Sequence, residues 1–155
     1  MRALFGAALA AILLTATPAT ARPIPDGGVT VREVADVLLA EGFKAEVGVD
    51  GVGDPKITSG AEGKTFVVLF YGCKQDRCVA YQMHAGFDVS TSPGLAKINE
   101  WNTKNRFGRA FLDAENDPIV EMDMDTEKGD TTEAISNNLA TWLAVLSKFT
   151  AFFDL

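Results

Sequence analysis

The first 21 residues set the earliest limit on the fold, because they have the pattern of a cleavable signal peptide and leave 134 of the 155 residues to fold. Arg2 supplies a short positive start, residues 3–14 are apolar, and small residues follow up to Ala21. A membrane-spanning helix needs about 20 apolar residues, and this run is interrupted from Thr15 onwards. We therefore expect cleavage near Ala21 and a periplasmic or secreted protein. A retained anchor or a buried N-terminal helix is the alternative.

The remaining chain is long enough for one domain with its own hydrophobic core. Residues 22–29 are rich in Pro and Gly, which predicts a flexible leader, and residues 30–155 form the predicted single domain. The chain has 14 basic and 21 acidic residues, and only Arg2 leaves with the signal, so its net charge changes from −7 to −8. Such a charge repels phosphates and predicts no nucleic-acid partner. No membrane insertion is expected after cleavage.

Two cysteines, Cys73 and Cys78, survive cleavage, and an exported protein with an even cysteine count usually pairs them. Four residues separate the pair, which differs from the C-x-x-C spacing that lowers the pKa of a redox-active thiol. A closed zinc site needs four protein ligands, and His84 is the only histidine of the chain that could join the two cysteines. We predict a structural disulfide and no metal. Redox exchange and metal binding stay as the alternatives.

Along the domain, segments with the sequence pattern of a helix alternate with segments that have the pattern of a strand. Thr30 and Glu33 have capping-box spacing and begin a first helix that Gly42 ends. Residues 45–49 alternate as a strand, residues 65–71 read as a central strand, and the cysteines bracket the turn to a returning strand. Ser92-Pro93 predicts the start of a second helix, and a second hairpin follows. Thr131 or Thr132 caps a long final helix.

The inner faces predicted for these helices are apolar stripes. On the first helix the stripe is Val31, Val34, Ala35, Leu38 and Leu39; on the second it is Leu95, Ile98, Trp101 and Asn102; on the last it is Ile135, Leu139, Trp142, Leu143, Leu146, Phe149 and Phe153. The resulting order is α-β-β-β-(β)-α-β-β-α. It predicts an α+β fold in which an antiparallel sheet carries helices largely on one face.

The usual catalytic motifs are missing from the sequence, which contains neither a G-x-S-x-G elbow, nor an H-E-x-x-H helix, nor a phosphate-binding loop. No cofactor is therefore expected. His84 lies within a predicted strand, where a structural histidine is the simpler interpretation. Asp123 and Asp125 share one face of another strand, and such pairs can perform acid/base chemistry or bind calcium. A solvated strand end is the simpler interpretation of this pair.

The most distinctive string of the chain runs over residues 98–110. Its candidate residues for partner binding or for a structural role are Asn99, Trp101, Asn102, Arg106 and Arg109. Asparagines near the end of a helix can cap its carbonyl groups, and the arginines can reach acidic partners. A structural role is the simpler interpretation and a binding role the alternative.

At this string the chain resembles the YbjN family of bacterial proteins, described as sensory transduction regulators. The resemblance extends over residues 31–153. It rests on Leu38 to Ala45 with Gly42-Phe43, on Asp54-Pro55-Lys56-Ile57, on Phe66 to Tyr71, on Ile98-Asn99-x-Trp101-Asn102 with Arg106-Phe107 and Ala110, and on Trp142. It implies a bent antiparallel sheet packed by helices, like that of type III secretion chaperones, and relatives that pair into dimers. It implies no catalytic residues. The signal peptide and the Cys73–Cys78 pair set this chain apart from the intracellular members of the family.

The resulting hypothesis is a non-enzymatic periplasmic binding or chaperone-like protein that captures a protein or peptide at an exposed strand edge or pairs with a second copy. A small periplasmic hydrolase or ligand-binding enzyme using Asp123 and Asp125 or His84 is the first alternative. It requires a pocket that gathers these groups. An envelope stress or sensory component is the second alternative.

Overall fold

Thr30 and Glu33 begin the first helix as their spacing predicts, in a computed structural model that describes residues 21–155. The predicted signal peptide lies outside the described residues, apart from Ala21. Helix α1 (Val31–Ala40) has both bonds of the capping box, and Gly42 follows it with a φ of +85°. Val34 and Leu38 are buried as expected, but Leu39 is exposed and Val37 is buried in its place. The helix therefore turns a neighbouring stripe toward the core.

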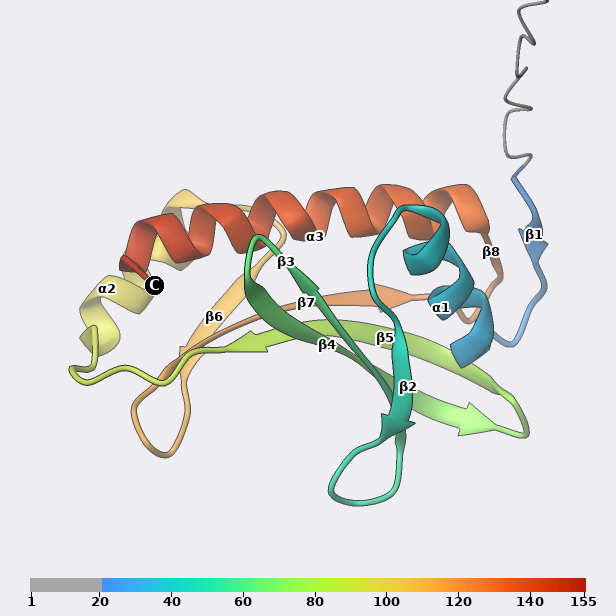
Figure 1. Cartoon of the computed structure of the whole chain (residues 1–155), viewed down its shortest axis with the longest axis horizontal. Coiled ribbons are helices and arrows are strands. Elements are labelled where there is room, and N and C mark those ends of the chain that lie inside the picture. The colour runs from blue at the N-terminus through green and yellow to red at the C-terminus, as the bar shows by residue number, and fades with distance from the viewer. Residues whose placement is uncertain (1–20) are drawn as a thin grey trace, which may run out of the picture.

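Six antiparallel strands form the main sheet in the order β2-β3-β4-β5-β7-β6 (Figure 1). Their bounds are β2 (Glu46–Val49), β3 (Pro55–Ala61), β4 (Lys64–Lys74), β5 (Arg77–Gly86), β6 (Arg109–Leu112) and β7 (Pro118–Asp125). The α+β class and the succession of strands and helices are confirmed. Because β7 lies between β5 and β6, the short strands β2 and β6 become the two edges of the sheet.

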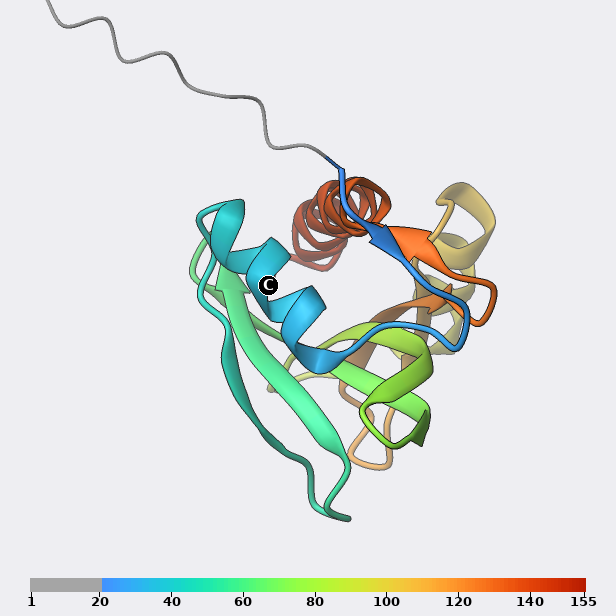
Figure 2. The ribbon, with the colours of Figure 1, turned by 90° about the vertical axis from the view of Figure 1, so that its right-hand side faces the viewer.

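One face of this sheet forms the core. Residues that pair across neighbouring strands point to the same face, and the row Ile57, Val68, Met83 and Met122 is buried throughout. The helix α3 (Thr132–Phe153) crosses this face together with α1, as the end-on view shows (Figure 2). Its predicted stripe is buried except for Leu143, which is half-buried, and Val145 is buried as well. Thr131 is its N-cap and accepts from the amide of Ala134 at 3.1 Å.

Helix α2 (Gly94–Lys104) stands against the edge strand β6 rather than over the sheet. It begins one residue later than the sequence predicts, with Pro93 as N-cap. Ile98 and Trp101 are buried, whereas Leu95, predicted on the inner face, is 73% exposed. The side of α2 that carries Trp101 faces the aromatic end of α3, where Lys97 of the first turn also lies over the rings of Phe152 and Phe153. No helix within residues 21–155 is long and apolar enough to cross a membrane.

Residues 22–29, expected to be a flexible leader, follow a defined path in the structure. Strand β1 (Pro23–Ile24) pairs with β8 (Asp130–Thr131), and the side chains of Ile24 and Val29 are buried. Val29 also exchanges two backbone hydrogen bonds with Cys78, at 2.8 and 3.0 Å. The Pro and Gly composition of the segment reflects these tight turns: at Gly28, where φ is +95°, a Cβ atom would overlap the Cys78 carbonyl.

Candidate functional site

The edge strand β2 has one neighbour, β3, and an uncovered side. Val47 and Val49 lie on the core side of the sheet by their register with β3, yet their side chains are 62% and 61% exposed. Their apolar surface extends the core face beyond the part that α1 and α3 cover. Exposed apolar side chains on a sheet edge are a typical site for the addition of another strand.

The backbone groups of this edge are also available. The amide of Asp50 donates to the carbonyl of Asp54 at 2.8 Å, and hydrogen-bonded and non-hydrogen-bonded pairs alternate along an antiparallel ladder. Every second residue before Asp50 is therefore bonded to β3, which includes Gly48. Val47 and Val49 lie between the bonded positions and direct their N–H and C=O groups away from β3. Pro55, which has no N–H, pairs with Val49, where no donor is needed.

The opposite edge, β6, is occupied by side chains of α2. The amide nitrogen of Asn102 donates to the carbonyl of Ala110 at 2.9 Å, and its amide oxygen accepts from the Ala110 N–H at 2.9 Å. The indole N–H of Trp101 donates to the carbonyl of Gly108 at 3.3 Å. Asn102 therefore takes the place that a seventh strand would have beside Ala110.

The distinctive string, residues 98–110, thus contributes mainly to covering the β6 edge. Trp101 packs edge-to-face on Phe149, with ring centroids 5.1 Å apart, and Asn105 donates to the Trp101 carbonyl at the end of α2. The exposed Asn99 contributes its carbonyl, which accepts from the hydroxyl of Thr103. Arg106 is exposed and lines a groove beside α3, together with Trp101.

The outer face of the sheet carries a polar row that joins residues from different parts of the chain. Arg109 forms an ion pair with the buried carboxylate of Glu121, and Nδ1 of His84 lies 3.4 Å from the same carboxylate. These three residues are in register across β6, β7 and β5. Burial lowers the pKa of His84. The sequence singled out His84 and Arg109 separately, and it gave no signal for Glu121 because a single glutamate in a strand usually faces solvent.

The carboxylates of Asp123 and Asp125 share the outer face, as alternation predicts, and both are exposed. Asp123 accepts from the Gln82 amide at 2.7 Å, and Asp125 accepts from the backbone amide of Glu127 at 2.9 Å. Residues 21–155 form several pockets, and five of the best formed have no lining from Asp123, Asp125 or His84. The pocket that the hydrolase alternative requires is therefore not among them. Within these residues no cluster of three metal-ligating side chains occurs either.

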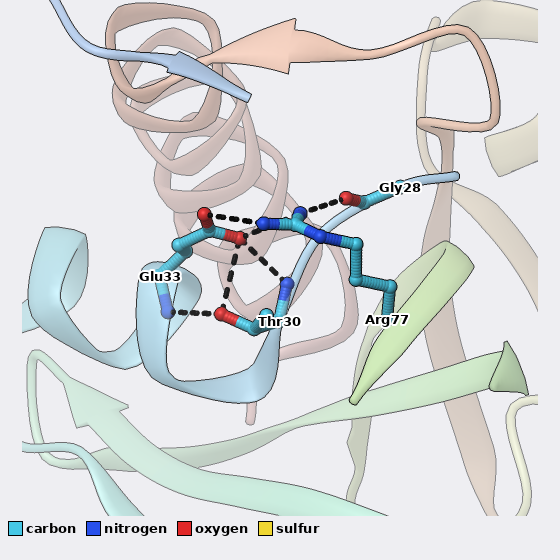
Figure 3. Close-up of polar contacts among 4 residues, drawn as sticks. All are labelled: Gly28, Thr30, Glu33 and Arg77. Atoms are coloured by element: carbon cyan, nitrogen blue, oxygen red, sulfur yellow. Dashed lines mark hydrogen bonds and ion pairs between the residues drawn. The ribbon is translucent and has the colours of Figure 1, made fainter. Parts of the chain in front are cut away.

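The disulfide Cys73–Cys78 joins directly paired residues of β4 and β5, across the predicted hairpin. Next to it Arg77 fixes the start of α1 (Figure 3). Its guanidinium donates to the Gly28 carbonyl at 2.5 Å and to both carboxylate oxygens of Glu33 at 3.2 Å. Burial raises the pKa of Glu33, but the hydrogen bonds from Thr30 and Arg77 outweigh it and hold that pKa below its ordinary value. The polar groups here are occupied by one another, which indicates a structural anchor.

Comparison with known proteins supports one assignment. The family model YbjN, described as "Putative bacterial sensory transduction regulator", matches residues 30–155. Neither the curated proteins nor the solved structures gave a match to this chain. The matched region begins at the N-cap of α1 and includes both edges of the main sheet.

Proposed function

This chain belongs to the YbjN family, and on that premise we propose that it is an exported, non-enzymatic binding protein that captures an extended segment of a partner protein at β2. The observation that carries the proposal is the uncovered edge, where Val47 and Val49 expose both side chain and backbone. Strand addition uses both features: backbone hydrogen bonds supply affinity, and alternate side chains supply selectivity.

Three further observations support an exported binding protein. The apolar leader and the Cys73–Cys78 disulfide fit an oxidising compartment. The family description names a regulator rather than an enzyme. Partner binding is also how a protein without a catalytic site transmits a signal, so a sensory role in the envelope agrees with this proposal. The likeness to secretion chaperones, which the family resemblance implies, agrees with it as well.

The test uses the mature protein, residues 22–155, purified from periplasm and returned to periplasmic extract. We expect the wild-type protein to retain a partner and the double variant Val47→Lys/Val49→Lys to lose it, because two ammonium groups then occupy the docking surface. Val52→Lys is the matched control, since Val52 is 85% exposed on the same hairpin but lies outside the strand.

A second variant, Val49→Pro, removes one outward-directed N–H without removing a bond to β3. It should weaken capture while leaving the unfolding midpoint unchanged. Hydrogen exchange at Val47 and Val49 should slow in the complex. Equal capture by the wild type and both edge variants would refute strand addition. A mass that rises with concentration in the purified protein, together with slowed hydrogen exchange at β2, would identify a second copy as the occupant.

A further inference from the structure

A groove of about 690 Å³ lies between α3 and the segment that joins α2 to β6, beside the edge opposite β2. Its lining comes from the end of α2, from the segment after it and from one face of α3. Its volume falls in the range of small-molecule sites, roughly 300–1,000 Å³. From its chemistry we propose that it binds a small amphipathic anion, a carboxylate or sulfonate attached to an alkyl or aromatic body.

The floor of the groove, on α3, is apolar at Ala140, Ala144 and Val145 and polar at Asn137 and Thr141. Ala140, Ala144 and Val145 present short side chains along α3, so the helix surface is low there. Phe107 stands at the side with 65% of its surface exposed, although it belongs to the part of the chain that packs against α3. Its φ of +71° is unfavourable for a bulky residue. The next residue, Gly108, is buried, and a Cβ atom there would collide with Val145. This close approach to α3 leaves the Phe107 ring beside the groove rather than in the core.

The ionisable residues that line the groove are all cations: Lys104, Arg106 and Lys148. Lys104 has a partner in Glu100 at 2.6 Å. Arg106 and Lys148 have no carboxylate within ion-pair distance among residues 21–155. The chain as a whole has a net charge of −7, so unpaired cations gathered at one groove form a local positive region on an acidic surface. Such a region attracts anions.

The apolar part of the floor and the unpaired cations together indicate the class of ligand. An inorganic anion would use the cations but not the apolar floor, and a neutral apolar molecule would leave the cations unused. The lining of α3 runs from Asn137 to Lys148, which is about 16 Å at 1.5 Å per residue. An alkyl chain or aromatic body of drug-like size fits along this length. Its anionic head can then meet the guanidinium of Arg106 or the ammonium of Lys148.

The experiment compares two ligands of equal chain length on the mature protein, decanoate and decyltrimethylammonium, both below their micelle concentrations, by isothermal titration calorimetry. We expect decanoate to bind and the cation not to bind. Arg106→Glu and Lys148→Glu should each weaken decanoate binding about tenfold or more, because a charge-assisted contact becomes a like-charge repulsion. Arg32→Glu is the matched control, since its side chain is 88% exposed on α1 and makes the same charge change away from the groove.

Ala144→Phe tests the floor independently of charge, because its ring fills the groove while all three cations remain. It should abolish decanoate binding with the unfolding midpoint unchanged. The proposal is overturned if the wild type does not bind decanoate, or if Arg106→Glu and Lys148→Glu leave the binding unchanged. It is also overturned if decyltrimethylammonium binds as well as decanoate. Binding of a poly-glutamate peptide at the groove without binding of decanoate overturns it too, and would assign the groove to an acidic segment of a protein. The edge variants of β2 should bind decanoate normally, so failure at the groove and failure at β2 are distinguishable.

Discussion

The two edges of the main sheet are both short strands of four residues, but only one of them has partners for its outward backbone groups. At β6 the outward backbone groups of Ala110 and the carbonyl of Gly108 are bonded by side chains of α2. At β2 the outward groups of Val47 and Val49 have no such partner within residues 21–155, and both side chains are exposed. One sheet thus has one edge closed by a dedicated helix and one edge open.

The difference shows where this fold protects itself and where it does not. An unprotected edge is an aggregation hazard that proteins cover, charge or shorten. Here β2 is short, and its first residue, Glu46, forms an ion pair with Lys44 at 2.6 Å. The short length and the charges limit indiscriminate pairing without covering the edge, as the proposed strand addition at β2 requires.

The largest expected effect comes from Trp101→Ala, which removes the anchor of the closing helix. Trp101 is fully buried and contacts three phenylalanine rings of α3. The free energy of unfolding should fall by about 3–5 kcal/mol, measured by urea denaturation. Leu95→Ala on the same helix is the control, because Leu95 is exposed and its loss should change stability by less than about 0.5 kcal/mol. Equal losses from both variants would contradict the role of Trp101 as the anchor of α2 against α3.

A smaller effect is expected from Asn102→Ala, which opens β6 while leaving α2 in place. Two hydrogen bonds to Ala110 are lost, and the cost should be about 1–2 kcal/mol, since water can replace part of them at an edge. The sharper readout is self-association, followed by sedimentation velocity. The variant should associate at concentrations where the wild type does not. An unchanged sedimentation coefficient would mean that Asn102 does not protect the edge.

Acid should loosen the start of α1 before it loosens the closing helix α2. The pKa of Glu33 is held below its ordinary value, so its carboxylate stabilises the folded state at neutral pH. That contribution is lost as the pH falls below about 4.5 and through the lowered folded-state pKa. Trp101 and Asn102 do not titrate, and the exposed Glu100–Lys104 pair on α2 contributes little. Amide exchange at the start of α1 should therefore rise before that of α2 on acidification, and Glu33→Gln should flatten this pH dependence.

The smallest effect on stability is expected at the open edge itself. Val47→Lys and Val49→Lys should each change the free energy of unfolding by less than about 0.5 kcal/mol, because both side chains are mostly exposed to water. Thermal denaturation of the two variants and of Val52→Lys should give the same midpoint. A large loss from either edge variant would show that the valines belong to the core, and the comparison between the edges would then fail.

The sequence by itself determined the local elements. The Thr30–Glu33 box, the Thr131 cap and the stripe of α3 depend on neighbours a few residues apart, and all three are found in the structure. The Cys73–Cys78 bridge also follows from proximity, because a hairpin of this length places the two residues opposite each other. Periodicity and spacing are sufficient where the interacting residues are close along the chain.

Only the tertiary structure decided which valines, leucines and cations stay outside. The alternation of residues 45–49 predicted a strand, and the strand order made it an edge at which Val47 and Val49 stay exposed. The segment at Ile24 looked flexible until β8 supplied its partner, 106 positions from Ile24 to Asp130. Glu121 contacts Arg109 and His84, and Arg106 lines the same groove as Lys148, only because strands and helices distant in sequence lie close together. A local pattern records which face a residue takes, and long-range packing decides whether anything lies against that face.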